Sequence, residues 1–318
     1  MKTLEELKEF YANDLSTDLQ QLEAKRKRVM QNTLIAVGVL IVLGLIGFGV
    51  MVSQDAPRFV FGFVLITGVA IGTIIFYLIG KSYKREFKQC IIGRIVQFIE
   101  PSLIYRPEDY IDESIFKSSK LFTHSIDLYN GEDLVRGRVD KTNLMFSELH
   151  AQYETGSGKN KTWHTLFKGL FFIADFNKHF RGQTVVLPDT AEKLFGGLGK
   201  MLQSWNVSRA DLIKLEDPEF EKEFVVYADD QIEARYILST SLMQRILDFK
   251  KKTGTKIHLS FTGSKVYVAV PMTKNMFEPK YFSSVGDFSP ILDYYRDLSF
   301  AAGIVDDLNL NTRIWTKE

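Results

Sequence analysis

Histidines and carboxylates are the side chains that most readily do chemistry in this sequence, and their spacing gives little support for a shared site. The five histidines fall in different predicted elements: His124, His150, His164, His179 and His258. None follows the HExxH, HxH or HxxxH spacing that brings two imidazoles to one metal ion. Glu148 with His150, and Asp175 with His179, could each bind a metal or transfer a proton, but a strand-face ion pair and a solvated turn are commoner. We therefore predict no metal site and no cofactor.

A loop with glycines and lysines, residues 156–162, suggests phosphate binding but has the wrong spacing. A Walker loop holds phosphates with backbone amides and a lysine that Ser or Thr follows. Here Asn160 follows Lys159, and Tyr153 stands where the first glycine is required. The segment 196–200 fails likewise, because Met201 follows its lysine, and no GxSxG elbow indicates a serine hydrolase. Residues 156–161 are therefore expected to form a hairpin loop.

The acidic segment 216–235 (EDPEFEKEFVVYADDQIEAR) is a candidate for ion binding. Asp229, Asp230 and Glu233 could bind a cation through carboxylate oxygens. A helix cap at Asp229 or Asp230, with Arg235 paired to a nearby acid, explains the same residues without a ligand. We favour this structural interpretation.

Charge and cysteine content exclude several functional classes. Lys and Arg total 40 and Asp and Glu 39; residues 1–100 hold 12 and 9 of these, which leaves 28 and 30 for residues 101–318. A domain with this balance does not bind nucleic acid by net charge. The single cysteine, Cys90, excludes an internal disulfide and a cysteine-based zinc site. It reads as a packing residue in a reducing compartment.

Two apolar stretches dominate the first hundred residues. Residues 34–52 are 19 uncharged residues and residues 59–80 are 22, each long enough to cross a hydrocarbon core of roughly 30 Å. They predict an N-terminal two-helix transmembrane hairpin, with spans at 34–52 and 59–80 and an external turn at 53–58. Eight cations flank the pair, against Arg58 in the turn: Lys25, Arg26, Lys27, Arg28, Lys81, Lys84, Arg85 and Lys88. This asymmetry places both termini in the cytoplasm.

The second span contains a GxxxG spacing formed by Gly68 and Gly72. Two glycines at this spacing let helix backbones approach closely. The sequence leaves open whether they form a homodimer or pack against the first span of the same chain.

The predicted spans are flanked by two polar helices. Residues 1–33 predict a cytoplasmic amphipathic helix, whose narrow apolar stripe is Leu4, Leu7, Tyr11, Leu15, Leu19 and Leu22. We expect the stripe to dock on the large domain; a short coiled coil and a membrane-surface helix are the alternatives. Residues 81–100 predict a cytoplasmic helical stalk. Its cations, Lys81, Lys84, Arg85 and Lys88, could lie near anionic lipid, at about 1 kcal/mol per charge, or only determine topology.

Residues 101–318 predict a cytoplasmic α+β domain with a mainly antiparallel sheet and flanking helices. Alternating apolar residues predict a meander of strands at 133–139, 144–153 and 163–175, and further strands at 185–187 and 224–227. A partly helical stretch is expected at 191–205. A helix from Ser241, with a capping box to Gln244, precedes a hairpin of 257–261 and 266–270 and a last helix at 290–307.

Three segments carry a resemblance to a known family: 131–149 (GEDLVRGRVDKTNLMFSEL), 166–182 (LFKGLFFIADFNKHFRG) and 216–238 (EDPEFEKEFVVYADDQIEARYIL). Behind two membrane helices, they resemble the bacterial domain of unknown function 3137 family, over roughly residues 80–280. The resemblance implies a bacterial inner-membrane protein with a cytoplasmic α+β domain. It implies no activity for any residue.

The leading hypothesis for function is a non-enzymatic module, anchored in the bilayer, that binds a protein partner or a lipid surface or acts as a scaffold. Lys159, Lys161 and Trp163, at the hairpin tip, are the candidate binding residues because their loop is free to touch an acidic surface. One version makes the domain a pleckstrin-homology-like barrel, although the helix after Ser241 argues against it. The alternative is a membrane-associated hydrolase or transferase, which requires two or more of these residues to converge: Asp133, Glu148, His150, Asp175, His179 and Arg235.

Overall fold

The computed structural model describes residues 2–53, 58–122, 124–176, 178–189 and 211–311. The chain divides into two compact units, residues 1–94 with 277–294 and residues 95–276 with 295–318. The sequence division assigned residues 277–294 to the large domain. In the structure this segment contacts the N-terminal helices.

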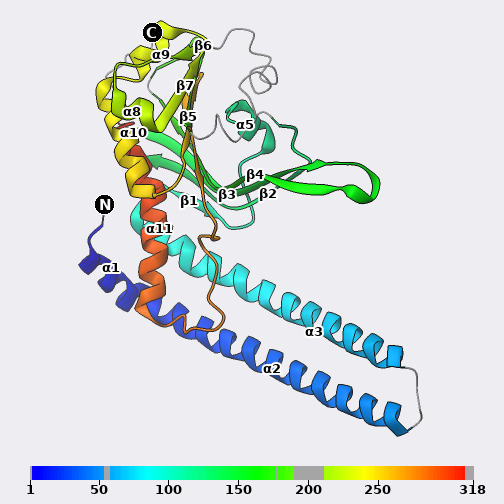
Figure 1. The fold of residues 1–318 in the computed structure, drawn as a ribbon. Helices are drawn as coiled ribbons and strands as arrows, with labels where there is room; N and C mark the ends of the chain where they lie inside the picture. Colours follow the sequence, from blue (N-terminus) through cyan, green and yellow to red (C-terminus); the bar gives the residue numbers. More distant parts are fainter. Residues whose placement is uncertain (1, 54–57, 123, 177, 190–210, 312–318) are drawn as a thin grey trace. The chain divides into compact units, whose positions relative to one another are not determined.

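The first unit is mainly helical (Figure 1). Its elements are α1 (Leu4–Phe10), the π-helical turn η1 (Tyr11–Leu15), α2 (Ser16–Ser53), α3 (Arg58–Phe87) and the π-helical turn η2 (Lys88–Ile92). Two further helices, α4 (Gly93–Ile99) and α11 (Phe288–Asp307), contain residues of both units. Thr3 begins α1 with a capping box to Glu6, which satisfies amide groups at the helix start.

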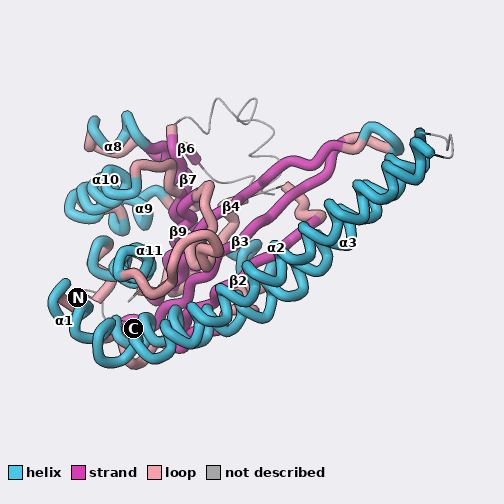
Figure 2. Tube along the Cα trace, turned by 90° about the horizontal axis from the view of Figure 1, so that it is seen from below, coloured by secondary structure: helices cyan, strands magenta, loops and turns pink. Residues whose placement is uncertain are grey.

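A helix near the N-terminus is long and apolar enough, by length and composition, to cross a membrane. It lies within Leu4–Gly49 and is the one such helix in the part of the chain that the structure describes. α3 lies beside α2 in both views (Figures 1 and 2). A Cβ atom added at Gly68 or Gly72 would lie 3.2 or 2.8 Å from a methyl group of Leu40. The two glycines therefore pack against α2 of the same chain, which is the intrachain alternative.

The apolar stripe of the N-terminal helix is buried at four positions, Leu7, Leu15, Leu19 and Leu22, whereas Leu4 is exposed. Tyr11 lies against Phe288 at 5.2 Å between ring centroids, and its hydroxyl donates a hydrogen bond to the carbonyl of Gly286. The stripe thus docks, in part, on the 277–294 segment.

The second unit is built on one nine-stranded antiparallel sheet, in the order β1-β2-β3-β4-β9-β8-β5-β7-β6. The strands are β1 (Ile104–Arg106), β2 (Leu128–Val139), β3 (Thr142–Thr155), β4 (Thr162–Asp175), β5 (Gln183–Pro188), β6 (Asp211–Ile213), β7 (Phe224–Ala228), β8 (His258–Thr262) and β9 (Lys265–Pro271). The predicted α+β class, the β2-β3-β4 meander and the β8-β9 hairpin are confirmed. The barrel version is wrong, because in the described part of the chain the strand order is open and has β1 and β6 at its two edges.

Short helices flank this sheet: α5 (Glu113–Ser118), α8 (Pro218–Glu223), α9 (Gln231–Ile237) and α10 (Thr240–Thr253). In Figure 1, α5 lies on one side of the sheet and α8 and α10 on the other. Phe116 of α5 packs with sheet residues that include Phe167 and Phe171. The predicted stretch at 191–205 lies outside the described residues.

The start of α10 corrects one detail of the sequence prediction. Ser239, not Ser241, caps the helix, with its hydroxyl accepting from the amide of Leu242. The two serines lie two residues apart, so either hydroxyl suits a cap, and the helix begins at the earlier one. The predicted end is confirmed: Gly254 has a φ of 64°, a left-handed conformation that glycine adopts without strain.

Candidate functional site

The tip of the β3-β4 hairpin extends beyond the neighbouring strands (Figure 1). Pairing of β3 with β2 ends at Gln152, and pairing of β4 with β9 begins at Gly169, whereas β3 and β4 pair with each other out to Thr155 and Thr162. Residues 153–164 thus form a two-stranded arm. Since an isolated two-stranded ribbon is at best marginally stable in water, the arm needs side-chain support.

Aromatic stacking supplies part of that support. The Tyr153 ring stacks on His164 across the arm and on His124, with centroid distances of 5.1 and 4.7 Å. The hydroxyl of Thr155 lies 2.8 Å from Nε2 of His164. These contacts give two of the histidines a structural role.

The three predicted binding residues lie on this arm. Trp163 is 49% exposed. Lys161 forms an ion pair with Glu154, with 3.0 Å between Nζ and a carboxylate oxygen, so its charge is compensated locally. Lys159 belongs to a 3₁₀ turn at the tip, and its side chain lies outside the described part of the structure.

The two predicted acid–histidine pairs have separate partners in the structure. Glu148 accepts a hydrogen bond from the amide of Met276, and His150 lies 3.5 Å from the hydroxyl of Thr165. Burial lowers the pKa of His150. In the second pair, the carboxylate of Asp175 accepts from Asn143 at 2.8 Å, and Nδ1 of His179 lies 3.2 Å from the hydroxyl of Ser264.

The acidic side chains at the end of the 216–235 segment accept hydrogen bonds from backbone amides. Asp230 caps α9 by accepting from two amides, and Asp229 accepts from the amide of Gln183. Glu233 accepts from the amides of Arg181 and Gly182. The capping part of the interpretation is confirmed at Asp230. The guanidinium of Arg235 donates to the carbonyl of Lys214 at 3.3 Å, rather than to the acid that the sequence analysis expected.

Three acidic side chains that are not all neighbours in the sequence come together in the folded chain. One carboxylate oxygen from each of Glu132, Asp133 and Glu148 lies within 4.8 Å of the others. Glu132 and Glu148 are directly paired across β2 and β3, and Asp133, with a φ of 66°, lies in the bulge of β2. Asp133 and Glu148 are buried, and Tyr105 donates to Asp133. Like charges opposite one another destabilise a sheet unless a proton or cation neutralises them.

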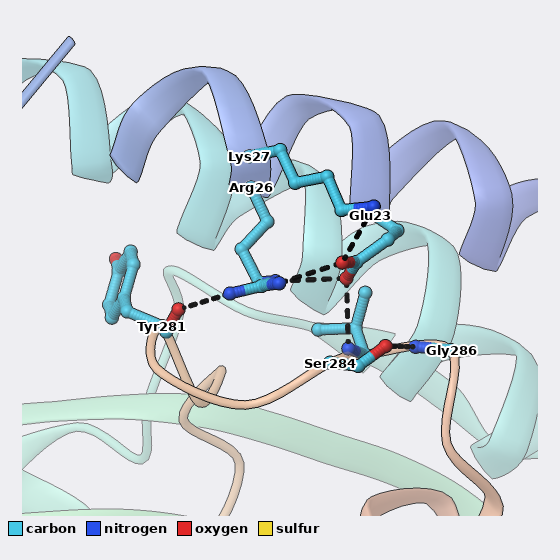
Figure 3. Close-up of polar contacts among 7 residues, drawn as sticks. Glu23, Arg26, Lys27, Tyr281, Ser284 and Gly286 are labelled. Carbon is cyan, nitrogen blue, oxygen red and sulfur yellow. Dashed lines mark hydrogen bonds and ion pairs between the residues drawn. The ribbon is translucent and has the colours of Figure 1, made fainter. Parts of the chain in front are cut away.

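A cluster of hydrogen bonds and ion pairs joins α2 to residues 277–287, which we call the 277–287 loop (Figure 3). Arg26 donates to both carboxylate oxygens of Glu23, at 2.9 and 2.7 Å, and to the carbonyl of Tyr281 at 2.7 Å. Glu23 also accepts from the amide of Val285 at 3.2 Å. The Arg26 hydrogen bond is the main cause that lowers the pKa of Glu23.

The same loop is tied to α3. The hydroxyl of Tyr281 donates to the carbonyl of Gly80 at 3.2 Å. Lys84 and Lys88 form ion pairs with Glu278 at 2.6 and 3.3 Å. The side chain of Lys88 is 2% exposed, so this cation, predicted to lie near lipid, is inside the first unit; Lys81 and Arg85 are exposed.

Residues 165–310 match the model of a family described as protein of unknown function (DUF3137). The chain resembles the DUF3137 family. The DUF3137 match includes the quoted segments 166–182 and 216–238 and excludes 131–149. It begins at residue 165 rather than near 80 and extends to residue 310 rather than ending near 280.

No curated protein matches the chain. Among solved structures, the crystal structure of the mycobacterial trehalose monomycolate transport factor A, TtfA, is similar, with 11% sequence identity and a TM-score of 0.33. The alignment covers 65% of this chain and 94% of that one.

Proposed function

We propose that the protein is a membrane-anchored module of the bacterial inner membrane, held by two spans at residues 34–52 and 59–80. The observation that carries this proposal is the uncovered apolar surface of both helices. Leu45 on α2 and Ile66 on α3 are 67% and 71% exposed, and other described apolar residues of these helices, such as Ile41 and Val69, are more than half exposed. A monomer in water rarely exposes so much contiguous apolar surface, whereas the acyl chains of a bilayer would cover it.

The flanking cations support an orientation with both termini in the cytoplasm. Lys25, Arg26, Lys84 and Lys88 are paired with carboxylates. This pairing does not weaken the argument, because topology follows the count of Lys and Arg near the spans and acidic residues contribute little.

The anchoring is tested by extracting membranes that contain the full chain. An integral two-span protein stays with the membrane at alkaline pH and is released by detergent, because its apolar helices have no stable place in water. Release by alkali alone would show peripheral attachment and would contradict the proposal.

We further propose that the β3-β4 arm binds a protein partner or lipid surface and that the module is not an enzyme. The support is the projection of the arm and the exposure of Trp163. Proteins that copurify with the tagged chain in mild detergent should be lost when Lys159→Glu, Lys161→Glu and Trp163→Ala are combined. An unchanged set of partners would remove the arm from the account.

The alternative function, a hydrolase or transferase, is favoured by the group of Glu132, Asp133 and Glu148. Three carboxylate oxygens within 4.8 Å could hold a divalent cation or share a proton for acid–base chemistry. Under this alternative, Mg²⁺, Mn²⁺ or Ca²⁺ raises the melting temperature of the wild type and not of Glu132→Gln. No shift with any of the three ions would argue against a metal-dependent enzyme.

A further inference from the structure

We infer that the 277–287 loop is a third membrane contact, with Phe282 inserted into the headgroup layer at the cytoplasmic ends of α2 and α3. This inference rests on the proposed function, because it requires those helices to span the bilayer. It adds a surface element to the two spans, at a loop that the sequence assigns to the soluble domain.

The depth of the loop is set by Tyr281. Its hydroxyl donates to the carbonyl of Gly80, the last residue of the second apolar stretch. Its own carbonyl accepts from Arg26, which belongs to the basic run before the first stretch. Tyr281 is therefore fixed where both helices change from apolar to charged, and tyrosine is typical of this interface.

Phe282 follows Tyr281 and is 85% exposed. Tyr281 and Val285 are held on either side by the Arg26 and Glu23 contacts, so the loop cannot simply turn the phenyl ring into the first unit without breaking them. A phenyl side chain gains by leaving water. The bilayer is the apolar phase that already begins at the level of Gly80.

The charges around the helix ends also favour a contact with the lipid bilayer. Arg28 on α2 and Lys81 on α3 are exposed, and each lies within a few residues of the predicted boundary. Cations at this position attract anionic lipid headgroups. An exposed aromatic ring on a loop that is held by two helix ends with exposed cations matches a bilayer surface better than the apolar surface of a second copy.

The test measures depth by fluorescence quenching. The full chain with Cys90→Ser is placed in vesicles of phosphatidylethanolamine and phosphatidylglycerol, and single cysteines replace Ser283, Val69 or Glu9. Each carries a bimane label, and quenchers are attached to lipids near the headgroup or deep in the acyl chains. Val69 lies 11 residues from Gly80, about 16 Å into the bilayer, and Glu9 lies about 25 Å outside it, 17 residues before Arg26.

The label at Ser283 should be quenched by the shallow lipid, the label at Val69 by the deep lipid, and the label at Glu9 by neither. Phe282→Ser should reduce quenching at Ser283 and leave Val69 unchanged. Quenching at Val69 without quenching at Ser283 overturns the loop contact and leaves the anchoring intact. An unquenched Val69 overturns the anchoring and the inference together, and protection of Ser283 from iodide without lipid quenching indicates a protein contact instead.

Discussion

Replacing Arg26 with alanine should release the 277–287 loop from α2. Arg26 makes three hydrogen bonds of 2.7 to 2.9 Å, two to Glu23 and one to the carbonyl of Tyr281. The side chains of Arg26 and Glu23 are 13% and 17% exposed, so water screens the pair only partly. Hydrogen bonds to a charged group stabilise by about 1.5–3 kcal/mol. In the variant the Val285 amide can still donate to Glu23, so the loop keeps one contact with α2, but we expect its closed state to be less stable by about 2 kcal/mol.

The assay is amide hydrogen exchange of the full chain in lipid nanodiscs. A local loss of about 2 kcal/mol corresponds to exchange about 30-fold faster at amides that are released with the loop. Val285 is the reporter, because its amide donates to Glu23. Protection in the sheet, for instance at Phe171, should not change.

Lys27→Ala is the matched control. Lys27 lies 3.9 Å from Glu23 and its side chain is 66% exposed, so removing it should cost about 0–1 kcal/mol. Equal exchange rates at Val285 in Arg26→Ala and Lys27→Ala would show that Arg26 does not hold the 277–287 loop on α2. Because the pKa of Glu23 is lowered in the folded state, the contribution of Glu23 is present above the unfolded-state pKa and is lost as pH falls through the lowered value.

Three further substitutions test other contacts. Burial raises the pKa of Tyr83, and its buried hydroxyl has no hydrogen-bond partner among the described residues; Tyr83→Phe should therefore raise the melting temperature in detergent, and a clear decrease would contradict this. Arg94 donates to the carbonyl of Asp14 in the π-helical turn at 2.7 Å, so Arg94→Gln should destabilise the first unit by about 1 kcal/mol. Unchanged hydrogen exchange of the η1 amides in the variant would show that this contact does not contribute to stability. Burial lowers the pKa of His258 to about 4 in the folded chain. As the pH falls from 7 to 5, His258 is therefore protonated in the unfolded chain but not in the folded one, and the free energy of unfolding should fall by about 2 kcal/mol. His258→Phe should remove that slope in denaturation of the second unit, and the same slope in the variant would assign it to other groups.

Local patterns in the sequence predict much of the sheet. The β2-β3-β4 meander, the β8-β9 hairpin and α10 follow from alternation, turn residues and a glycine at the helix end. The cap of α10 was misplaced because Ser239 and Ser241 offer the same hydroxyl chemistry. Local sequence decides the type of an element better than its first residue.

The sites depend on pairings that no local pattern contains. Glu148 lies opposite Glu132 because of the strand register, and a shift of one residue would turn it to the other face. Arg26 reads as one cation in a basic run, although it binds a carbonyl 255 residues away. In both cases the partner is set by tertiary structure, and neither spacing nor charge predicts it.

Cysteine accessibility tests the central claim, a two-span anchor with a cytoplasmic second unit, most directly. In a Cys90→Ser background, cysteine replaces Ser53 between the two predicted spans or Ser157 on the arm, and intact cells are treated with a membrane-impermeant maleimide. We predict labelling at Ser53 from outside and labelling at Ser157 only after the membrane is opened. Labelling of Ser157 in intact cells, with Ser53 protected, would contradict the orientation, and access to neither or both from outside would contradict the two spans.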